Sequence, residues 1–263
     1  MFNFCSLYSG SAGNCLLVQT DETNILIDAG VSQKKILSAL TSFNITLENI
    51  DAILVTHEHS DHIASVGSIS KKYNIPVYCN EETLKAMPSQ KAKIHDDNQK
   101  IFKNGTSFKI KNLEILPFSI PHDAANPCAF NIFHNNQKIS VATDIGHINN
   151  DLISKLKDSS FILLEANYDP DILKYSKYPF QLKQRILSST GHLSNETAGK
   201  TISELFLKNG LKKAMLGHLS KENNFPELAL KTVYNELELK NISEKDISIN
   251  VASRNNPSQL IKI

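Results

Sequence analysis

The residues best suited to chemistry lie in the hexapeptide 57–62, which reads His-Glu-His-Ser-Asp-His. Histidine offers a neutral nitrogen and aspartate a hard oxygen, and this mixture suits zinc and similar divalent cations. Three imidazoles and a carboxylate so close together are hard to explain by packing. The hexapeptide follows an apolar run, 53–55, that predicts a buried strand. The pattern therefore indicates a metal site at a strand end and metal-assisted hydrolysis.

The spacing within the hexapeptide suggests how its side chains divide. Residues two apart in a strand point the same way, so His57 and His59 are expected to face one metal ion if the strand geometry persists. By the same alternation Glu58 should face away from them. The turn into the next helix is expected to direct Asp61 and His62 toward a second ion.

Other potential ligands end apolar runs in the same manner. His122 follows the run 115–121, Asp144 follows 139–143 and His218 follows 214–217. A ligand type at the end of each run is what a site assembled along a sheet edge requires. Asp123 is a rival to its neighbour His122, and the residues alone leave that choice open.

These residues must be positioned by alternating strands and helices. Strands are predicted near 14–19, 24–28, 52–56, 76–79, 107–110, 113–119, 128–134, 138–143, 161–165, 213–217 and 247–251. Helices are predicted near 33–41, 62–73, 81–86, 149–156, 195–208 and 225–238, with Ser194 capping the fifth and Gly210 ending it. This alternation favours α/β layers. No linker or repeat divides the chain, so we expect one domain over 1–263.

Composition excludes some classes of function. The 263 residues carry a net charge of only +1, so any nucleic-acid-binding surface must be local. No apolar run approaches the ~18 residues of a membrane helix, and the N-terminal residues do not resemble a signal peptide. The four cysteines form no CxxC pair. A reducing, cytoplasmic location without membrane association is therefore expected.

The motif series resembles that of the metallo-β-lactamase-fold superfamily, which has HxHxDH followed by a lone His, a lone Asp and a last His. The resemblance implies a four-layer αββα sandwich with a dinuclear metal centre. It also implies a metal-bridging hydroxide as the nucleophile, and ions that are zinc first, with manganese or iron as alternatives. The implied ligands are His57, His59 and His122 for the first ion and Asp61, His62 and His218 for the second, with Asp144 bridging them and Asp28 orienting the ligand loop.

Two further segments resemble the YycJ/WalJ subfamily, which is associated with 5′→3′ DNA exonuclease activity. The first is the turn 9–14, Ser-Gly-Ser-Ala-Gly-Asn. The second comprises Glu165 and His192, which resemble the glutamate and histidine of transfer-RNA 3′-processing nucleases. The resemblance implies that Glu165 orients His192 and that His192 protonates the leaving oxygen, with Asp61 also in the catalytic group. The alternatives are a plain hairpin turn and a histidine that packs at a strand end.

Substrate contacts are the least specific part of this prediction. Small and polar residues near these motifs could contact a phosphate, and the candidates are Ser9, Ser11, Asn14, Ser194, Ser220 and Asn223. The segment 174–185 interleaves cations with aromatics, which is typical of a single-strand binding surface but also of a solvated loop. The predicted function is a phosphodiesterase acting on DNA. A glyoxalase II-like thioesterase, a lactonase or a cyclic phosphodiesterase is the enzymatic alternative, and a metal-bound sensor without turnover is the non-enzymatic one.

Overall fold

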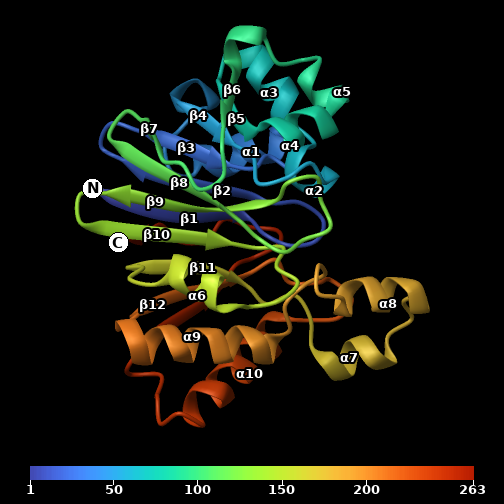
Figure 1. Ribbon diagram of the computed structural model, residues 1–263. Helices are drawn as coiled ribbons and strands as arrows, with labels where there is room; N and C mark the ends of the chain where they lie inside the picture. The colour runs from blue at the N-terminus through green and yellow to red at the C-terminus, as the bar shows by residue number, and fades with distance from the viewer. The chain divides into compact units, whose positions relative to one another are not determined.

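Two mixed β-sheets organise residues 1–263, all of which the computed structural model describes (Figure 1). The first sheet has the order β14-β1-β2-β3-β4-β5-β6. Its strands are β1 Phe2–Tyr8, β2 Cys15–Thr20, β3 Asn24–Ile27, β4 Ala52–Leu54, β5 Val77–Asn80, β6 Gln99–Phe102 and β14 Ile261–Lys262. The pairs from β14 to β3 are antiparallel and those from β3 to β6 are parallel. The carboxyl ends of β3 and β4 therefore lie at the same edge, which places Asp28 beside the loop that follows β4.

The second sheet has antiparallel pairing at one end and parallel pairing at the other. Its antiparallel strands are β7 Phe108–Ile110, β8 Leu113–Ser119 and β9 Cys128–His134. Its parallel strands are β10 Gln137–Ala142, β11 Phe161–Glu165, β12 Lys213–Gly217 and β13 Ser248–Val251. Parallel pairing aligns the carboxyl ends of β10, β11 and β12, where Asp144, Glu165 and His218 follow or end each strand.

The chain divides into two compact units. Unit 1 comprises Met1–Ser119, Ala124–His134 and Ser253–Ile263, and unit 2 comprises Ile120–Asp123 and Asn135–Ala252. The first sheet and β7 to β9 lie in unit 1, and β10 to β13 lie in unit 2. The expectation of a single domain stays a prediction.

Unit 1 packs apolar side chains on both faces of its first sheet. One face is covered by helices that present Ile36, Leu40, Val66 and Ile69 to strand residues such as Leu26. On the other face, aromatic rings stack across the two sheets, with Tyr78 and Phe108 centroids 5.2 Å apart. The helices of unit 1 are α1 Gln33–Thr41, α2 Ser60–Ile63, α3 Val66–Tyr73, α4 Glu81–Ala86 and α5 Pro88–Lys91, with short 3₁₀ turns at Leu47–Asn49 and Asp96–Asn98.

Unit 2 surrounds its parallel strands with helices. These are α6 Asn150–Leu156, α7 Pro170–Tyr175, α8 Phe180–Leu187, α9 Asn195–Asn209 and α10 Pro226–Glu238. Helices α9 and α10 pack side by side, and Figure 1 shows α7 and α8 projecting past them at one end of the unit. Ser194 caps α9 by accepting a hydrogen bond from Thr197 N, and Gly210 ends it in the left-handed region, as predicted. No helix combines the length and apolar character needed to cross a membrane.

Most predicted elements correspond to observed ones, but β6, β14 and α5 were not predicted, and three other differences have a structural explanation. The helix expected at 62–73 is broken, because Ser65 leaves the helical ladder and bonds to Ala29 O and Val31 O. Strand β1 was missed because it is buried along its whole length and so shows no alternation. The segment 174–185, weighed against a solvated loop, contributes to helices α7 and α8.

The chain's last residues close the edge of the first sheet. Ser258 N donates to Ser6 O and Ile263 N donates to Phe2 O. Ser258 also covers Cys5, whose thiol donates to its carbonyl oxygen. Burial raises the pKa of the Cys5 thiol to about 11. This thiol is therefore protected by the C-terminal segment.

We predict that deletion of residues 257–263 exposes Cys5. The loss of the two backbone hydrogen bonds and of strand burial should lower the free energy of unfolding by about 2–4 kcal/mol, as measured by urea denaturation. One additional thiol should react with Ellman's reagent under native conditions. Cys15 and Cys128, which are fully buried elsewhere in unit 1, serve as internal controls. An unchanged number of reactive thiols would contradict this account.

Candidate metal centre

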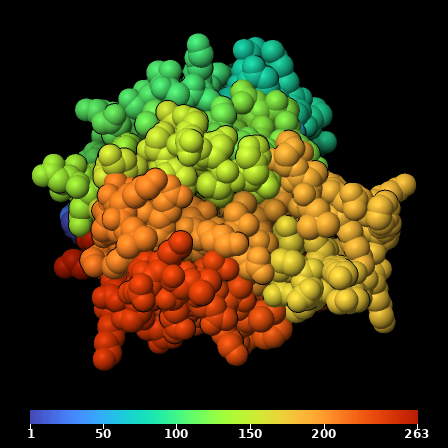
Figure 2. Space-filling model, turned by 60° about the horizontal axis from the view of Figure 1, so that its bottom comes forward, coloured from blue at the N-terminus to red at the C-terminus, as the bar shows by residue number.

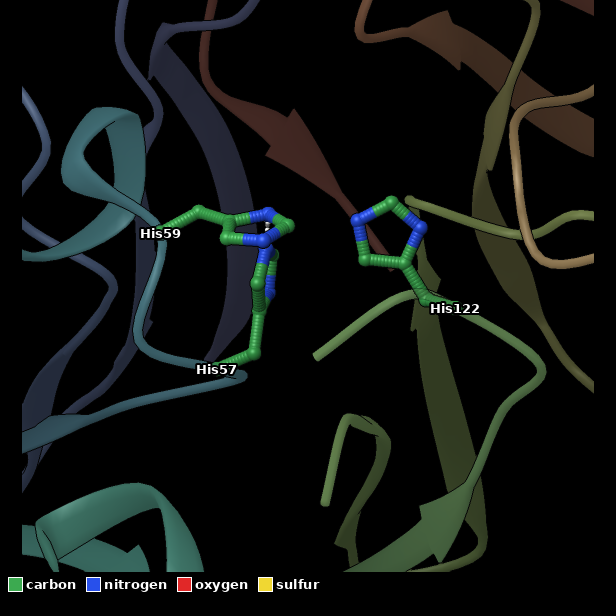
Figure 3. A group of neighbouring side chains, drawn as sticks. All are labelled: His57, His59 and His122. Atoms are coloured by element: carbon green, nitrogen blue, oxygen red, sulfur yellow. Dashed lines mark hydrogen bonds between the residues drawn. The ribbon is translucent and has the colours of Figure 1, made fainter. Parts of the chain in front are cut away.

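The metal-motif residues of unit 1 lie on a loop that follows β4 and on α2. Strand geometry ends at Leu54, so the condition under which strand alternation would bring His57 and His59 together is not met. The loop nevertheless brings the rings of His57 and His59 together, with His57 Nε2 and His59 Nδ1 3.0 Å apart (Figure 3). Glu58, between the two histidines, accepts a hydrogen bond from Ala125 N. The HxH pair thus comes from a loop conformation and not from strand alternation.

Asp28 organises this loop from the end of β3. Its carboxylate accepts hydrogen bonds from Thr56 N and Thr56 Oγ1, both at 2.9 Å, and lies 2.7 Å from His62 Nδ1. Both acidic and imidazole groups are buried. A carboxylate on Nδ1 selects the tautomer that offers Nε2 as a ligand, and His62 Nε2 lies 3.4 Å from Asp61 Oδ2. Asp28 therefore contacts both Thr56 and His62, and its role in orienting the ligand loop stays a prediction.

The glycine-rich turn before β2 also supports the loop. Asn14 N donates to Asp61 O at 2.8 Å, and Gly30 N donates to Asn14 O. The Asn14 side chain accepts from Gly10 N and lies 3.1 Å from His62 Nε2. A Cβ atom at Gly30 would lie 1.6 Å from Asp61 O, so only glycine fits there. This part of the turn positions Asp61 and His62 through backbone contacts.

Unit 2 carries a second cluster at the carboxyl ends of its parallel strands. One ligand atom from each of Asp144, Glu165, His192 and His218 lies within 4.8 Å of the others. Asp144 and His218 have positive φ angles of 60° and 55°, as Asp28 does in unit 1 at 62°. Non-glycine residues adopt this region infrequently, and such conformations gather at functional sites. The left-handed residue turns the chain sharply where each strand ends.

Glu165 is the centre of this cluster. It is fully buried, and Oε1 lies 2.8 Å from His192 Nδ1 and 2.9 Å from His218 Nδ1. Oε2 accepts hydrogen bonds from Ile145 N and Leu193 N. Burial opposes ionisation, but His192 and the hydrogen bonds outweigh it and hold the pKa of Glu165 below its ordinary value. Glu165 therefore orients two histidines, whereas the sequence suggested only His192.

His122 approaches the same cluster from the start of unit 2. Its Nδ1 lies 3.1 Å from Gly191 O, and its Nε2 lies 3.8 Å from Asp144 Oδ1. Burial lowers the pKa of His122, which favours the neutral imidazole that a metal ion requires. The rival Asp123 has both carboxylate oxygens bonded to the guanidinium of Arg185. The geometry within unit 2 thus favours His122 over Asp123 as a ligand.

His192 is more exposed than His122 and His218, the two predicted histidine ligands of unit 2. Its side chain is 16% exposed, compared with 2% for His218. Burial opposes its protonation, but the carboxylate of Glu165 outweighs this and raises the pKa of His192 above its ordinary value. Its backbone N donates to Ile186 O, the last turn of α8. The imidazole of His192 is therefore fixed by Glu165 and remains partly accessible to solvent.

Several residues proposed to contact the substrate form hydrogen bonds within the protein. Ser194 caps α9, and Ser220 Oγ accepts from Asn223 N. Ser9, Ser220 and Asn223 are buried, and Ser11 is exposed. Their substrate-binding role stays a prediction, as do the assignments of the metal ligands.

Two functional candidates were missed by sequence reasoning. Thr56 bridges Asp28 and the histidine motif, with Oγ1 3.0 Å from His57 Nδ1. Asn167 Nδ2 donates to His218 O at 2.8 Å. Thr56 immediately precedes His57, and Asn167 follows Glu165 by two residues. A single hydroxyl or amide side chain forms no motif, so the sequence does not mark either residue as functional.

The chemistry of the donors fits divalent cations. Unit 1 offers three imidazoles and a carboxylate from one motif, and unit 2 offers buried imidazoles beside Asp144. In both units a buried carboxylate holds a histidine by Nδ1, which is the usual support of a ligating histidine.

A model of the Beta-lactamase superfamily domain matches residues 23–218. The chain belongs to this superfamily. It is 40% identical over 238 residues to exodeoxyribonuclease WalJ of Streptococcus pneumoniae, covering 90% of this chain and 88% of that protein. It is 37% identical to exodeoxyribonuclease YycJ of Bacillus anthracis, covering 90% of both. The predicted resemblance to the YycJ/WalJ subfamily is confirmed.

Solved structures show the same fold at low sequence identity. The metallo-β-lactamase fold protein YhfI of Bacillus subtilis has a TM-score of 0.70 at 17% identity, covering 98% of this chain and all of that one. The Zn²⁺-bound PqqB of Methylobacterium extorquens has a TM-score of 0.72 at 14% identity, covering 98% of this chain and 99% of that one. The predicted fold class, an α/β metallo-β-lactamase fold with two mixed sheets flanked by helices, is confirmed.

We predict that Gly30→Ala weakens metal binding without unfolding the chain. The added methyl group displaces the Asp61 backbone, and a disturbed ligand support typically costs 10–100-fold in metal affinity. Competition with a chromophoric chelator measures this affinity, and circular dichroism monitors the fold. Ala12→Ser, on the exposed part of the neighbouring turn, is the matched control. Wild-type affinity in Gly30→Ala would show that the contact with Asp61 is dispensable.

Proposed function

We propose that this protein is a metal-dependent exodeoxyribonuclease that degrades DNA from the 5′ end. One observation carries the proposal: the buried Glu165 holds His192 beside Asp144 and His218. The names of the relatives that are 37–40% identical support DNA as the substrate. Phosphodiester cleavage expels a sugar oxygen, a poor leaving group that needs a proton donor. A thioester or lactam hydrolase has less need for such a histidine.

We propose that two divalent ions bind, zinc first, with manganese or iron as alternatives. His57, His59 and His122 would hold one ion, Asp61, His62 and His218 the other, and Asp144 both. When bound, the ions would supply an activated hydroxide and neutralise charge on the phosphate. The motif order of the superfamily and the donor set within each unit support this assignment.

The chain's own residues supply orientation and a proton. Glu165 accepts from His192 Nδ1 and fixes the plane of the ring. His192 Nε2 is then the atom that would hold the proton for the leaving oxygen. Glu165 also contacts His218 Nδ1, and His218 is a predicted metal ligand. The same carboxylate therefore contacts the proposed proton donor, His192, and this ligand.

The proposal also includes a cellular location and is weighed against a rival class of substrate. All four cysteines are free and buried, which supports a reducing, cytoplasmic location. The net charge of only +1 favours the rival class, small-molecule hydrolases such as a glyoxalase II-like thioesterase, a lactonase or a cyclic phosphodiesterase.

Activity on matched substrates tests the proposal. Purified protein reconstituted with zinc or manganese is assayed on 5′-labelled single-stranded DNA and on S-lactoylglutathione. We expect mononucleotide release from the 5′ end, loss of this activity after dialysis against a chelator, and its recovery on adding metal. Cleavage of the thioester without cleavage of DNA would overturn the proposal.

We predict that His192→Ala lowers kcat for DNA by roughly 10²–10⁴-fold while the protein retains its bound metal. The control is His147→Ala, since His147 is exposed on a neighbouring loop and its Nδ1 bonds to Ser189 O. Single-turnover kinetics and metal analysis measure the two effects separately. A wild-type rate in His192→Ala would remove this residue from the mechanism.

A further inference from the structure

Two aromatic rings of unit 2 stand uncovered at the junction of α7 and α8. Tyr175, at the end of α7, is 76% exposed, and Phe180, at the start of α8, is 74% exposed. Figure 2 shows the segment that contains them projecting at the right of unit 2. Soluble proteins bury most large rings, so two exposed rings so close in sequence indicate a contact surface.

The backbone under these rings is held in place. Tyr178 and Leu182 pack against a small core made by Tyr168, Leu173 and Ile186. Lys183 Nζ donates to Lys174 O and Ser176 O, which ties the start of α8 to the end of α7. The segment therefore buries one side and presents the other as a fixed platform.

The positive charge of this segment indicates which class of molecule it binds. Residues 172–187 contain Lys174, Lys177, Lys183 and Arg185 and no acidic residue, although the whole chain carries a net charge of only +1. Lys174 Nζ lies 5.1 Å from the centroid of the Tyr175 ring. Cations beside exposed rings bind single-stranded nucleic acids, because the cations meet phosphates and the rings stack on bases.

A cavity lies against the same residues. It has a volume of about 500 Å³ and is lined by Ile172, Tyr175, Ser176, Lys177, Tyr178 and Glu222. Two tyrosines in its wall offer flat faces to a base, whereas Glu222 would repel a phosphate. The lining thus suits a base inside the cavity and the phosphate on the lysine side.

Helix α8 links this platform to His192. Its rise of 1.5 Å per residue places Phe180 roughly 9 Å along the axis from Ile186, whose carbonyl oxygen accepts from His192 N. This length is about that of three stacked nucleotides. Arg185 on the same helix is bonded to Asp123, the neighbour of His122.

We propose that Tyr175 and Phe180, with Lys174 and Lys177, form a platform on which bases of a single-stranded DNA substrate stack a few nucleotides from the cleaved bond. This inference rests on the proposed exonuclease function and adds to it the surface that binds the strand. It accounts for how a nearly neutral chain binds a polyanion: affinity comes from stacking and from a local group of lysines.

The test compares a variant that lacks both aromatic rings with a variant that retains them. Tyr175→Ala/Phe180→Ala is paired with Tyr175→Phe/Phe180→Tyr, which retains both rings. Binding of a fluorescent oligothymidylate of about ten nucleotides is measured by anisotropy. We expect the dissociation constant to rise roughly 5- to 100-fold in the alanine variant and to stay near the wild-type value in the ring-retaining one. Leu239→Ala, at an exposed apolar residue after α10, is the control for lost apolar surface.

Kinetics and salt dependence separate this inference from the proposed function. The kcat/KM ratio of the oligonucleotide to bis(p-nitrophenyl) phosphate, a diester too small to reach the rings, should fall in the alanine variant. Lys174→Gln/Lys177→Gln should reduce the slope of log affinity against log salt by roughly 0.7 per lysine. DNA cleavage with unchanged affinity in the alanine variant would overturn the platform alone. Absence of DNA binding and cleavage by the wild-type protein would overturn both.

Discussion

A buried carboxylate that holds a histidine by Nδ1 is the interaction on which the candidate residues of each unit depend. Asp28 does this for His62 in unit 1, and Glu165 does it for His192 and His218 in unit 2. A buried carboxylate is costly unless every lone pair is used. The backbone N–H and hydroxyl of Thr56 complete the hydrogen bonding of Asp28, and the backbone N–H groups of Ile145 and Leu193 complete that of Glu165. Removing either acid would therefore disturb the ring and the surrounding loop together.

The parallel sheet geometry explains why such carboxylates are available. Strands β10, β11 and β12 end at one edge, and the chain turns sharply there at Asp144 and His218, both with positive φ. A short strand followed at once by a tight turn keeps the side chain close to the sheet edge. The polar groups thus sit at the ends of hydrogen-bonded strands, while partly exposed His192 comes from a loop.

Much of the site could be predicted because its residues share a motif and a place after apolar runs. The HxHxDH segment, His122, Asp144 and His218 all carry that signal. Thr56 and Asn167 act through single hydrogen bonds that depend on the folded chain, so no local pattern marks them. The need for glycine at position 30 arises from contact with Asp61, 31 residues later in the sequence. Likewise, the double role of Glu165 required β12 to lie beside β11.

The division of unit 1 among three chain segments has a consequence for biosynthesis. Residues 253–263 are translated after all of unit 2, yet Ile261 and Ser258 pair with the first strand. At ribosomal rates of about 5–20 residues per second, β1 waits roughly 13–50 seconds for this partner. An unpaired strand edge is a template for aggregation. During this interval the outer edge of β1 is open to pairing with another chain.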